Sequence, residues 1–396
     1  MTRSQRVSEP FLPYGRQEIS DADVEAVVAT LRSELITQGP RVERFESAMA
    51  DYLGARHAVA VANGTAALHL AALAADVGPG DQLITTPMTF AASANCALYA
   101  GAQPRFVDIS RDTWNLDTEA TAAAVDDRTR AVVAVSYGGL PVDLKPLERV
   151  RERVVVIEDG CHALGGHRAG TKVGGPGGAD MTTFSFHPVK AMTTGEGGLV
   201  TTEDHALARR LRLLRTHGIT REGVSPGPAD GGWYYEMTDL GFNYRITDFQ
   251  CALGASQLER LEGWVARRNE IAARYRELLA DEERIDLPPA ASEGSLHGYH
   301  LFPVRVRAGA DARLATFEAL RRAGLGVQVH YIPIYWLPYY RDTLGYPQDE
   351  CPEAERLYSG LISMPMFPAM ANSDIDRVAV ELSSALDQAE ERSKTQ

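Results

Sequence analysis

The chain has 396 residues, of which 44% are hydrophobic and 23% charged, and its formal net charge at pH 7 is −13. A chain of this length suggests two compact units, and an acidic balance without a basic stripe argues against nucleic-acid binding. The segment Met1–Pro13 lacks the apolar run of a signal peptide, no stretch reads as a membrane helix, and the four cysteines are far apart. We therefore expect a reduced, cytoplasmic protein.

Short β-rich runs alternate with Ala- and Leu-rich stretches, such as Thr65–Ala75 and Leu116–Ala124, from about Arg56 to Thr202. Several of the runs are continuously apolar, as in a sheet that is covered on both faces. The alternation predicts an α/β domain with a mostly parallel central sheet sandwiched by helices. The expected strands are His57–Val61, Leu83–Thr86, Pro104–Ile109, Ala131–Val135, Val154–Glu158, Thr182–Phe186 and Leu199–Thr202.

The first expected strand runs through Asn63 into a helix. The free N–H groups and the positive dipole end of a helix N-terminus form a site for anions. Gly64 lets a phosphate approach the backbone closely, and the Thr65 hydroxyl adds a donor. Such junctions are common, so this motif alone indicates only an anion site.

The strand Val154–Glu158 ends at Asp159, and His162 follows three residues later. A carboxylate at the end of an apolar strand is costly unless it has a cationic partner. A protonated pyridine nitrogen would serve as that partner, whereas the structural alternative is an aspartate that caps the next turn. His162 either contacts the same ring or is a satisfied core histidine.

The most informative motif lies between Phe184 and Gly198, where a strand delivers Ser185, then His187 and then Lys190. Lys190 comes just past the end of the strand, where ligands of open α/β sheets bind. Most such lysines are simply solvated, but a lysine of lowered pKa there forms an imine with an aldehyde cofactor. A phosphate site, a carboxylate for a pyridinium and a lysine for an aldehyde are together what pyridoxal 5′-phosphate (PLP) requires.

Apolar residues recur on one face from about Ile246 to Trp264, which predicts a long amphipathic helix capped by Thr247 or Asp248. The pattern then shortens after Pro288. We expect a boundary near residue 260, between a large PLP-binding unit (1–260) and a smaller C-terminal α+β unit (261–396), with the N-terminal segment packing on the smaller one. The elements expected in the smaller unit are Arg267–Leu279, Tyr299–Arg305, Ala312–Ala323, Gly326–Val329 and Ser373–Ala385.

Two segments rich in Gly and Pro, Val173–Ala179 and Val224–Gly232, are either surface loops or loops that close over a site. The aromatic cluster at 331–340 either contacts a nucleotide base or packs a domain edge. A metal site at Cys161, His162 and His167 fits no usual zinc spacing, so we expect no metal.

Several motifs are distributed over nearly the whole chain: Pro13–Gln17, Thr37–Pro40, Asn63–Leu68, Glu158–Ala163, Phe184–Lys190 with Thr193–Gly198, His217–Ile219, Leu240–Asp248 and Val329–Pro333. In these motifs the sequence resembles the DegT-type sugar-nucleotide aminotransferases, which are fold-type I PLP enzymes, and within them the pseudaminic-acid subgroup. That subgroup aminates C4 of a UDP-linked 4-keto-6-deoxy-N-acetyl hexose. The sequence departs from it at Ser136–Pro141, where a His-Phe-Ala-Gly-Gln-like stretch is more usual.

The resemblance implies that Lys190 is the Schiff-base lysine, that Asp159 contacts the ring nitrogen, and that His162 assists catalysis. Phe90 would stack on the pyridine ring, and Asn243 would reach the cofactor phosphate of a partner subunit, which implies a homodimer with shared active sites. The residues implied at the cofactor phosphate of the same subunit are Gly64, Thr65, Ala66 and Ser185. Those implied at the sugar are Tyr14, Thr37, His187, His330 and Tyr331.

The expected function is amino-sugar biosynthesis by transamination of a nucleotide-linked keto sugar, with L-glutamate as the amino donor. One alternative is an aminotransferase that acts on a TDP-linked keto sugar in specialised metabolism. A PLP-fold sugar dehydratase would carry histidine in place of Lys190, and a non-catalytic relative would not need the complete set of Asp159, Ser185 and Lys190. A nicotinamide-dependent dehydrogenase would need a Gly-x-Gly-x-x-Gly turn, which the sequence lacks.

Overall fold

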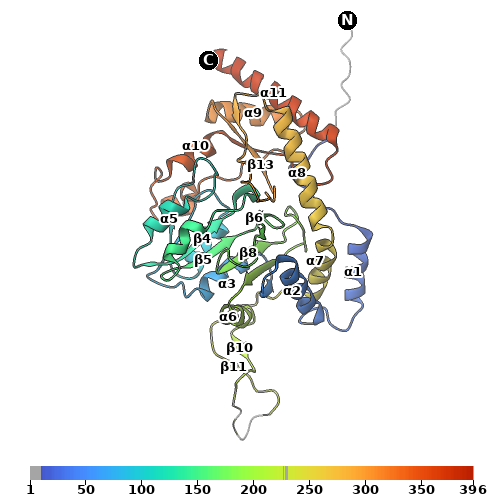
Figure 1. Ribbon diagram of the computed structural model, residues 1–396, viewed down its shortest axis with the longest axis vertical. Helices are drawn as coiled ribbons and strands as arrows, with labels where there is room; N and C mark the ends of the chain where they lie inside the picture. The colour runs from blue at the N-terminus through green and yellow to red at the C-terminus, as the bar shows by residue number, and fades with distance from the viewer. Residues whose placement is uncertain (1–9, 226, 228–230, 396) are drawn as a thin grey trace.

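The computed structural model describes residues 10–225, 227 and 231–395, and it is built around a seven-stranded sheet (Figure 1). The strand order is β1-β9-β8-β5-β4-β2-β3. The strands from β8 to β3 pair in parallel, whereas β9 pairs antiparallel with both β8 and β1. The strands are β1 (His57–Val61), β2 (Gln82–Thr85), β3 (Gln103–Phe106), β4 (Thr129–Val135), β5 (Val155–Asp159), β8 (Met181–Ser185) and β9 (Gly198–Thr202). The predicted α/β architecture with a mostly parallel sheet is confirmed.

Both faces of this sheet are buried, which explains why its strands are continuously apolar. On β4, Val133 packs into the cluster under the helices of one face, while Val132 and Ala134 pack into the cluster of the opposite face. The first face is covered by α3 (Gly64–Ala74), α4 (Ala92–Tyr99) and α6 (His205–Arg215). The second is covered by α2 (Pro40–Leu53), α5 (Thr118–Ala124) and the 3-10 helix η2 (Lys145–Val150).

A second hydrophobic core forms around a three-stranded antiparallel sheet of β12 (Ile285–Asp286), β13 (Phe302–Val306) and β14 (Leu361–Met364). The N-terminal segment packs here, because Leu12 exchanges backbone hydrogen bonds with Gly324 and Gly326. We propose that this core belongs to a unit separate from the large sheet, with the division near residue 260. Its helices are α8 (Leu261–Leu278), α9 (Ala310–Arg322), α10 (Pro352–Gly360) and α11 (Asn372–Thr395).

The long helix predicted for Ile246–Trp264 is wrong, because helical structure stops after Leu258 in α7 (Asp248–Leu258) and resumes in α8. At the break, Arg260 donates to the buried carboxylate of Asp23 at 2.6 Å, in α1 (Asp21–Leu31). Thr247 is the N-cap of α7, as one of the two predicted caps. From the break, α8 leads away from α7 toward the second core (Figure 1).

The strand predicted for Gly326–Val329 is not formed. The segment makes one isolated bridge, between Gln328 and Ser363. The reason is that Gly326 donates to the carbonyl of Leu12, so successive residues bond to different segments rather than along one strand.

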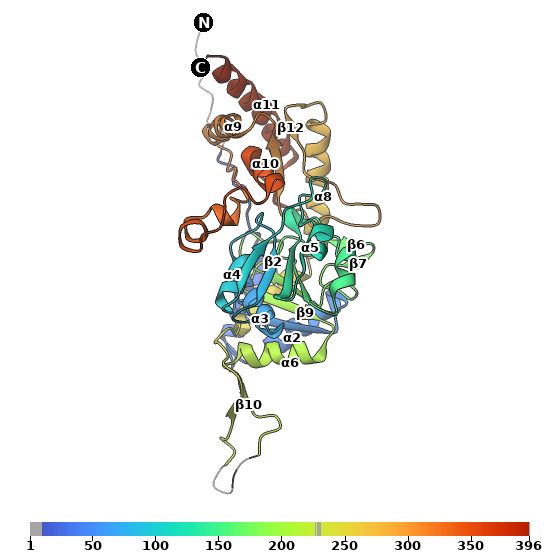
Figure 2. The same cartoon turned by 90° about the vertical axis from the view of Figure 1, so that its left-hand side faces the viewer.

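A narrow hairpin of β10 (Ile219–Thr220) and β11 (Glu236–Met237) projects from the body beyond α6, as both views show (Figures 1 and 2). It carries exposed apolar side chains, including Trp233, which is 71% exposed. The hairpin contains the segment Val224–Gly232, of which residues 226 and 228–230 lie outside the described residues. The other Gly-rich segment, Val173–Ala179, packs on the large sheet, where the Thr201 hydroxyl donates to the carbonyl of Gly174. No helix among the described residues has the length and hydropathy needed to cross a membrane.

Candidate active site

Asp159 is the last residue of β5, and its carboxylate is buried at the carboxyl end of the sheet. One oxygen accepts a hydrogen bond from the Ser93 hydroxyl at 2.7 Å, and the other accepts from the backbone N–H of Cys161 at 3.1 Å. Ser93 is hydrogen-bonded in turn to Thr89 at 2.8 Å. Two neutral donors therefore fix the orientation of the carboxylate, and its charge influences the nearby Lys190 amine, although no ion pair joins the two among the described residues. A cationic ligand group is the partner that such a carboxylate lacks.

His162 follows Asp159 in a tight turn and is buried. Its Nε2 atom is hydrogen-bonded to the hydroxyl of Tyr331 at 3.2 Å, and its ring lies 4.5 Å from the ring of His300, centroid to centroid. Burial and the nearby Lys190 amine lower the pKa of His162 well below its ordinary value. The imidazole is thus neutral, and its buried Nδ1 atom has no hydrogen-bond partner in the described part of the chain.

Lys190 lies five residues beyond the end of β8, in the turn that leads back to β9. Its backbone N–H donates to the carbonyl of His187 at 2.9 Å. Burial lowers the pKa of the Lys190 amine, and the nearby Cys161 and Asp159 offset part of this effect. A lowered pKa increases the fraction of free amine, which is the form that attacks an aldehyde and accepts a proton.

Gly64 at the start of α3 and Ser185 at the end of β8 form a cradle. A β-carbon on Gly64 would lie 2.8 Å from that of Ser185, so only glycine permits this approach. Asn63 caps the helix by accepting from the N–H of Ala66 at 2.8 Å. The adjoining backbone of Gly64 and Thr65 lies at the positive end of the helix dipole, which favours an anion such as phosphate.

Four more of the predicted site residues lie around His162. Tyr331 contacts His162 directly and faces Phe90, with ring centroids 6.2 Å apart. The rings of Tyr14 and His330 lie 5.4 Å apart. Phe90 is 61% exposed, so this side of the site is open in the single chain.

Two of the remaining predicted residues, Thr37 and Asn243, lie elsewhere, whereas the backbone of His187 contacts Lys190. Thr37 is exposed and bridges to Thr247, His187 is exposed, and Asn243 is exposed at the base of the projecting hairpin, where it bridges to Thr216. No described contact joins Thr37 or Asn243 to the cluster around Lys190.

Of the predicted aromatic cluster at 331–340, Tyr335 and Tyr340 are buried against Phe106. These two residues pack a core between the large sheet and the segment 334–343. Of the same cluster, Tyr331, Trp336 and Tyr339 are more exposed, so these rings remain the candidates for a nucleotide-base contact.

The site sits on a close contact between two segments. The carbonyls of Gly138 and Gly139, after β4, accept from the backbone N–H groups of Leu301 and Gly298 at 3.1 and 2.8 Å. A β-carbon on Gly139 would lie 2.6 Å from the backbone nitrogen of Tyr299. Because His300 belongs to the second of these segments, the contact also places its ring against His162.

The residues present fit PLP. The Gly64–Ser185 cradle suits a phosphate, Asp159 lacks the cation that a ring nitrogen would provide, and Lys190 is an amine of lowered pKa. No group of three or more His, Cys, Asp or Glu side chains in the described part of the chain is arranged to hold a metal ion.

Sequence reasoning missed Ser93, Thr89 and His300. None of them was assigned a role from a motif, although Thr89 directly precedes Phe90 and Ser93 follows Phe90 by three residues. Their roles come from contacts between distant segments, which spacing along the chain does not encode.

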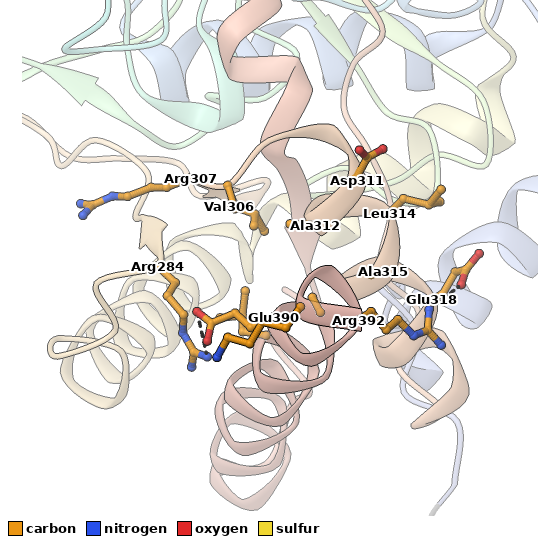
Figure 3. Close-up of a pocket in the computed structure, with 14 residues that line it drawn as sticks. Arg284, Val306, Arg307, Asp311, Ala312, Leu314, Ala315, Glu318, Glu390 and Arg392 are labelled. Atoms are coloured by element: carbon orange, nitrogen blue, oxygen red, sulfur yellow. Dashed lines mark ion pairs between the residues drawn. The ribbon is translucent and has the colours of Figure 1, made fainter. Parts of the chain in front are cut away.

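A hollow of about 620 Å³ lies away from these residues, on the small sheet between α9 and α11 (Figure 3). Arg284 and Arg392 on its rim form ion pairs with Glu390 and Glu318. All of its lining residues lie between 284 and 394, so it contains none of the groups that PLP needs.

Residues 17–383 match the DegT/DnrJ/EryC1/StrS aminotransferase family. Spore coat polysaccharide biosynthesis protein SpsC of Bacillus subtilis is 38% identical to the chain over 374 residues, which cover 93% of this chain and 95% of SpsC. Spr1654 of Streptococcus pneumoniae, solved in PMP and PLP forms, is similar in structure with a TM-score of 0.90 for the PMP form at 28% identity, covering 97% of this chain and 100% of that one. Helicobacter pylori PseC, an aminotransferase involved in the biosynthesis of pseudoaminic acid, gives a TM-score of 0.87 at 29% identity, over 95% of this chain and 99% of PseC.

Proposed function

Since this chain belongs to the DegT/DnrJ/EryC1/StrS aminotransferase family and is a PLP-dependent sugar aminotransferase, we propose that it transfers an amino group from L-glutamate to C4 of a UDP-linked 4-keto-6-deoxy-N-acetyl hexose. The observation that carries the chemistry is the Lys190 amine, whose pKa is lowered by burial beside the fixed carboxylate of Asp159. The similarity to PseC supports the choice of sugar.

In this proposal the chain's own residues have separate tasks. Thr65, Ala66 and Ser185 hold the phosphate in the cradle at Gly64, and Asp159 holds a proton on the ring nitrogen. Bound PLP supplies an aldehyde carbon and a cationic ring that accepts electrons. Lys190 would hold that aldehyde carbon and, as a free amine, would act as the general base and acid that takes and returns the proton of the donor's α-carbon.

The sugar would lie on the open side of Lys190. Tyr331 and His330 form one wall with Tyr14 behind them, and Phe90 would contact the face of the pyridine ring. His162 is neutral and bonded to Tyr331, so it connects the wall of the sugar pocket to the cofactor.

A homodimer with shared sites completes the proposal. The hairpin projects away from its own subunit and exposes Trp233, Tyr235 and Met237, which are expensive to leave in water. A second copy of the chain that covers these side chains would bring Asn243 to the neighbour's cofactor phosphate. The proposal includes a cytoplasmic location, with the four cysteines as free thiols.

The test is an absorbance spectrum of the PLP-loaded protein before and after addition of L-glutamate, followed by a panel of UDP- and TDP-linked 4-keto-6-deoxy sugars. We expect the visible band of the lysine-bound cofactor to fall with glutamate and to return with a UDP-linked N-acetyl sugar. Return of the band only with a TDP-linked sugar would replace the substrate by the alternative from specialised metabolism. A band that is indifferent to every amino donor would contradict the proposal.

A further inference from the structure

Tyr137 lies in the 3-10 turn η1 (Tyr137–Gly139) that follows β4, and its ring is buried. Its hydroxyl donates a hydrogen bond to the backbone carbonyl of His330 at 2.5 Å, across 193 residues of sequence. Burial raises the pKa of Tyr137 far above its ordinary value, so the hydroxyl keeps its proton and stays a donor at every physiological pH.

The tyrosine itself is held rigidly. Its backbone N–H donates to the side-chain oxygen of Asn115 at 2.8 Å, and the amide nitrogen of Asn115 donates to the carbonyl of Leu140 at 3.0 Å. One asparagine therefore bonds to both ends of the turn. A hydroxyl mounted on such a turn has little freedom to follow its acceptor, so it fixes the position of the acceptor instead.

The acceptor is the carbonyl of the peptide bond that joins His330 to Tyr331. The two residues on either side of this carbonyl are held by hydrogen bonds of their side chains, and the segment after them by a backbone hydrogen bond. The His330 ring is hydrogen-bonded to Ser363 at 2.9 Å, and the Tyr331 hydroxyl to His162 at 3.2 Å. Farther along, the N–H of Ile334 donates to the carbonyl of Pro87 at 3.1 Å. Between these hydrogen bonds, the hydroxyl of Tyr137 donates to the backbone carbonyl of His330.

We propose that Tyr137 is a positioning residue for the acceptor sugar, because its hydroxyl fixes the His330–Tyr331 peptide and with it the two rings that line the sugar pocket. This inference rests on the proposed function, which assigns those rings to the sugar. Tyr137 is buried behind the peptide and does not itself line the open side of the site. Its removal should therefore change how well the pocket wall is placed for the sugar, with a smaller effect on the groups that react with the cofactor.

The test replaces Tyr137 by Phe, which removes one oxygen and retains the ring. Loss of a buried hydrogen bond of this kind corresponds to about a five- to tenfold weakening. We expect KM for the UDP-linked keto sugar to rise by about that factor in Tyr137→Phe, while kcat and the rate of the half-reaction with L-glutamate change by less than about twofold. The dissociation constant of the same UDP-sugar for the cofactor-free protein, measured by calorimetry, should rise in parallel.

Tyr275→Phe is the matched control. Tyr275 is a buried tyrosine of α8 whose hydroxyl also donates to a backbone carbonyl, that of Pro365, in the core around the small sheet. Both variants should lose thermal stability to a similar extent, but only Tyr137→Phe should weaken sugar binding.

The outcomes separate the two proposals. If the wild-type protein shows no half-reaction with glutamate, the proposed function fails. If the wild type turns over and Tyr137→Phe keeps the wild-type KM and dissociation constant for the sugar, the positioning role is wrong. The positioning role would also be wrong if Tyr137→Phe slowed both half-reactions equally, or if it and Tyr275→Phe had the same KM for the sugar. Either result would point to a general loss of stability.

Discussion

The carboxylate of Asp159 and the hydroxyl of Ser93 are joined by a hydrogen bond of 2.7 Å between the end of β5 and the first turn of α4. Thr89 extends the pair into a chain of three side chains. The carboxylate proposed to keep the cofactor's ring nitrogen protonated is thus oriented by a helix on one face of the sheet rather than by a charged neighbour.

Replacing Ser93 by Ala should leave Asp159 with only the backbone donor of Cys161. A hydrogen bond to a charged group contributes about 1.5–3 kcal/mol, so we expect kcat/KM to fall roughly tenfold or more in steady-state assays. Ser93→Thr retains a hydroxyl and should recover most of the activity. Wild-type kinetics in Ser93→Ala would show that the carboxylate needs no such orientation.

Replacement of Lys190 by Ala should abolish turnover, since the amine is both the attachment point and the proton carrier in the proposed reaction. Lys190→Arg is the sharper variant, because it keeps the positive charge but is never deprotonated. Both should lack the visible band of the lysine-bound cofactor and should not turn over on prolonged assay. Full turnover by either variant would remove Lys190 from the mechanism.

The Gly64–Ser185 cradle predicts a cofactor-binding defect in Gly64→Ala. The new β-carbon would lie 2.8 Å from that of Ser185, so the start of α3 must shift away from β8. We expect the dissociation constant for PLP, measured by equilibrium dialysis, to rise about tenfold, which is about 1.4 kcal/mol. Gly78→Ala is the matched control, because a β-carbon there meets nothing within 4 Å; a similar defect in both variants would argue against the cradle.

Several parts of this arrangement are predictable from the sequence because they depend on neighbours along the chain. The strands of the large sheet are recognisable because burial on both faces demands continuous apolar runs, as in Val132–Val135. The strand-end positions of Asp159 and Lys190 likewise follow from where those runs stop.

Other parts depend on contacts between distant segments. Helical periodicity continues through Glu259, and the break there follows from the bond between Arg260 and Asp23, 237 residues apart in the chain. Ser93 and Tyr137 carry no local signal for the same reason, since their acceptors are chosen by the tertiary fold.

The buried histidines predict a pH dependence of stability. Burial lowers the pKa of His297 to about 3 and that of His330 to about 4, with further lowering from Arg276 and Lys190, respectively. The unfolded chain takes up these protons near pH 6.5 and the folded chain does not, so stability is complete above about pH 6.5 and falls as the pH drops toward 4.

We therefore expect the melting temperature of the cofactor-free protein to fall between pH 6.5 and pH 4.5. Each such histidine contributes a slope of up to about 1.4 kcal/mol per pH unit. His297→Asn retains an acceptor for the N–H of Tyr299, which the histidine ring now serves at 2.9 Å, and should reduce the slope by one such contribution. A melting temperature that is flat or rises toward acid would contradict this expectation.

Shared active sites predict complementation between two defective variants. Lys190→Ala lacks the amine, and Asn243→Ala lacks the contact proposed for the neighbouring subunit. When the two are unfolded together and refolded, heterodimers contain one site with both residues intact, so about a quarter of all sites should be complete. Recovery of sugar amination above the sum of the separate variants is the expected result, and strictly additive activities would indicate sites within single chains.

The close contact of Gly138 and Gly139 with the segment 298–301 has a consequence for motion. A rigid-body rotation of the small sheet against the large one would have to break both backbone hydrogen bonds beneath His162. It would also have to pull Gly138 and Gly139 away from the segment 298–301, against which Gly139 is packed closely. We therefore expect this contact to oppose a hinge rotation at the floor of the site. We therefore expect the entry and release of substrates to depend on movable segments at the rim of the site.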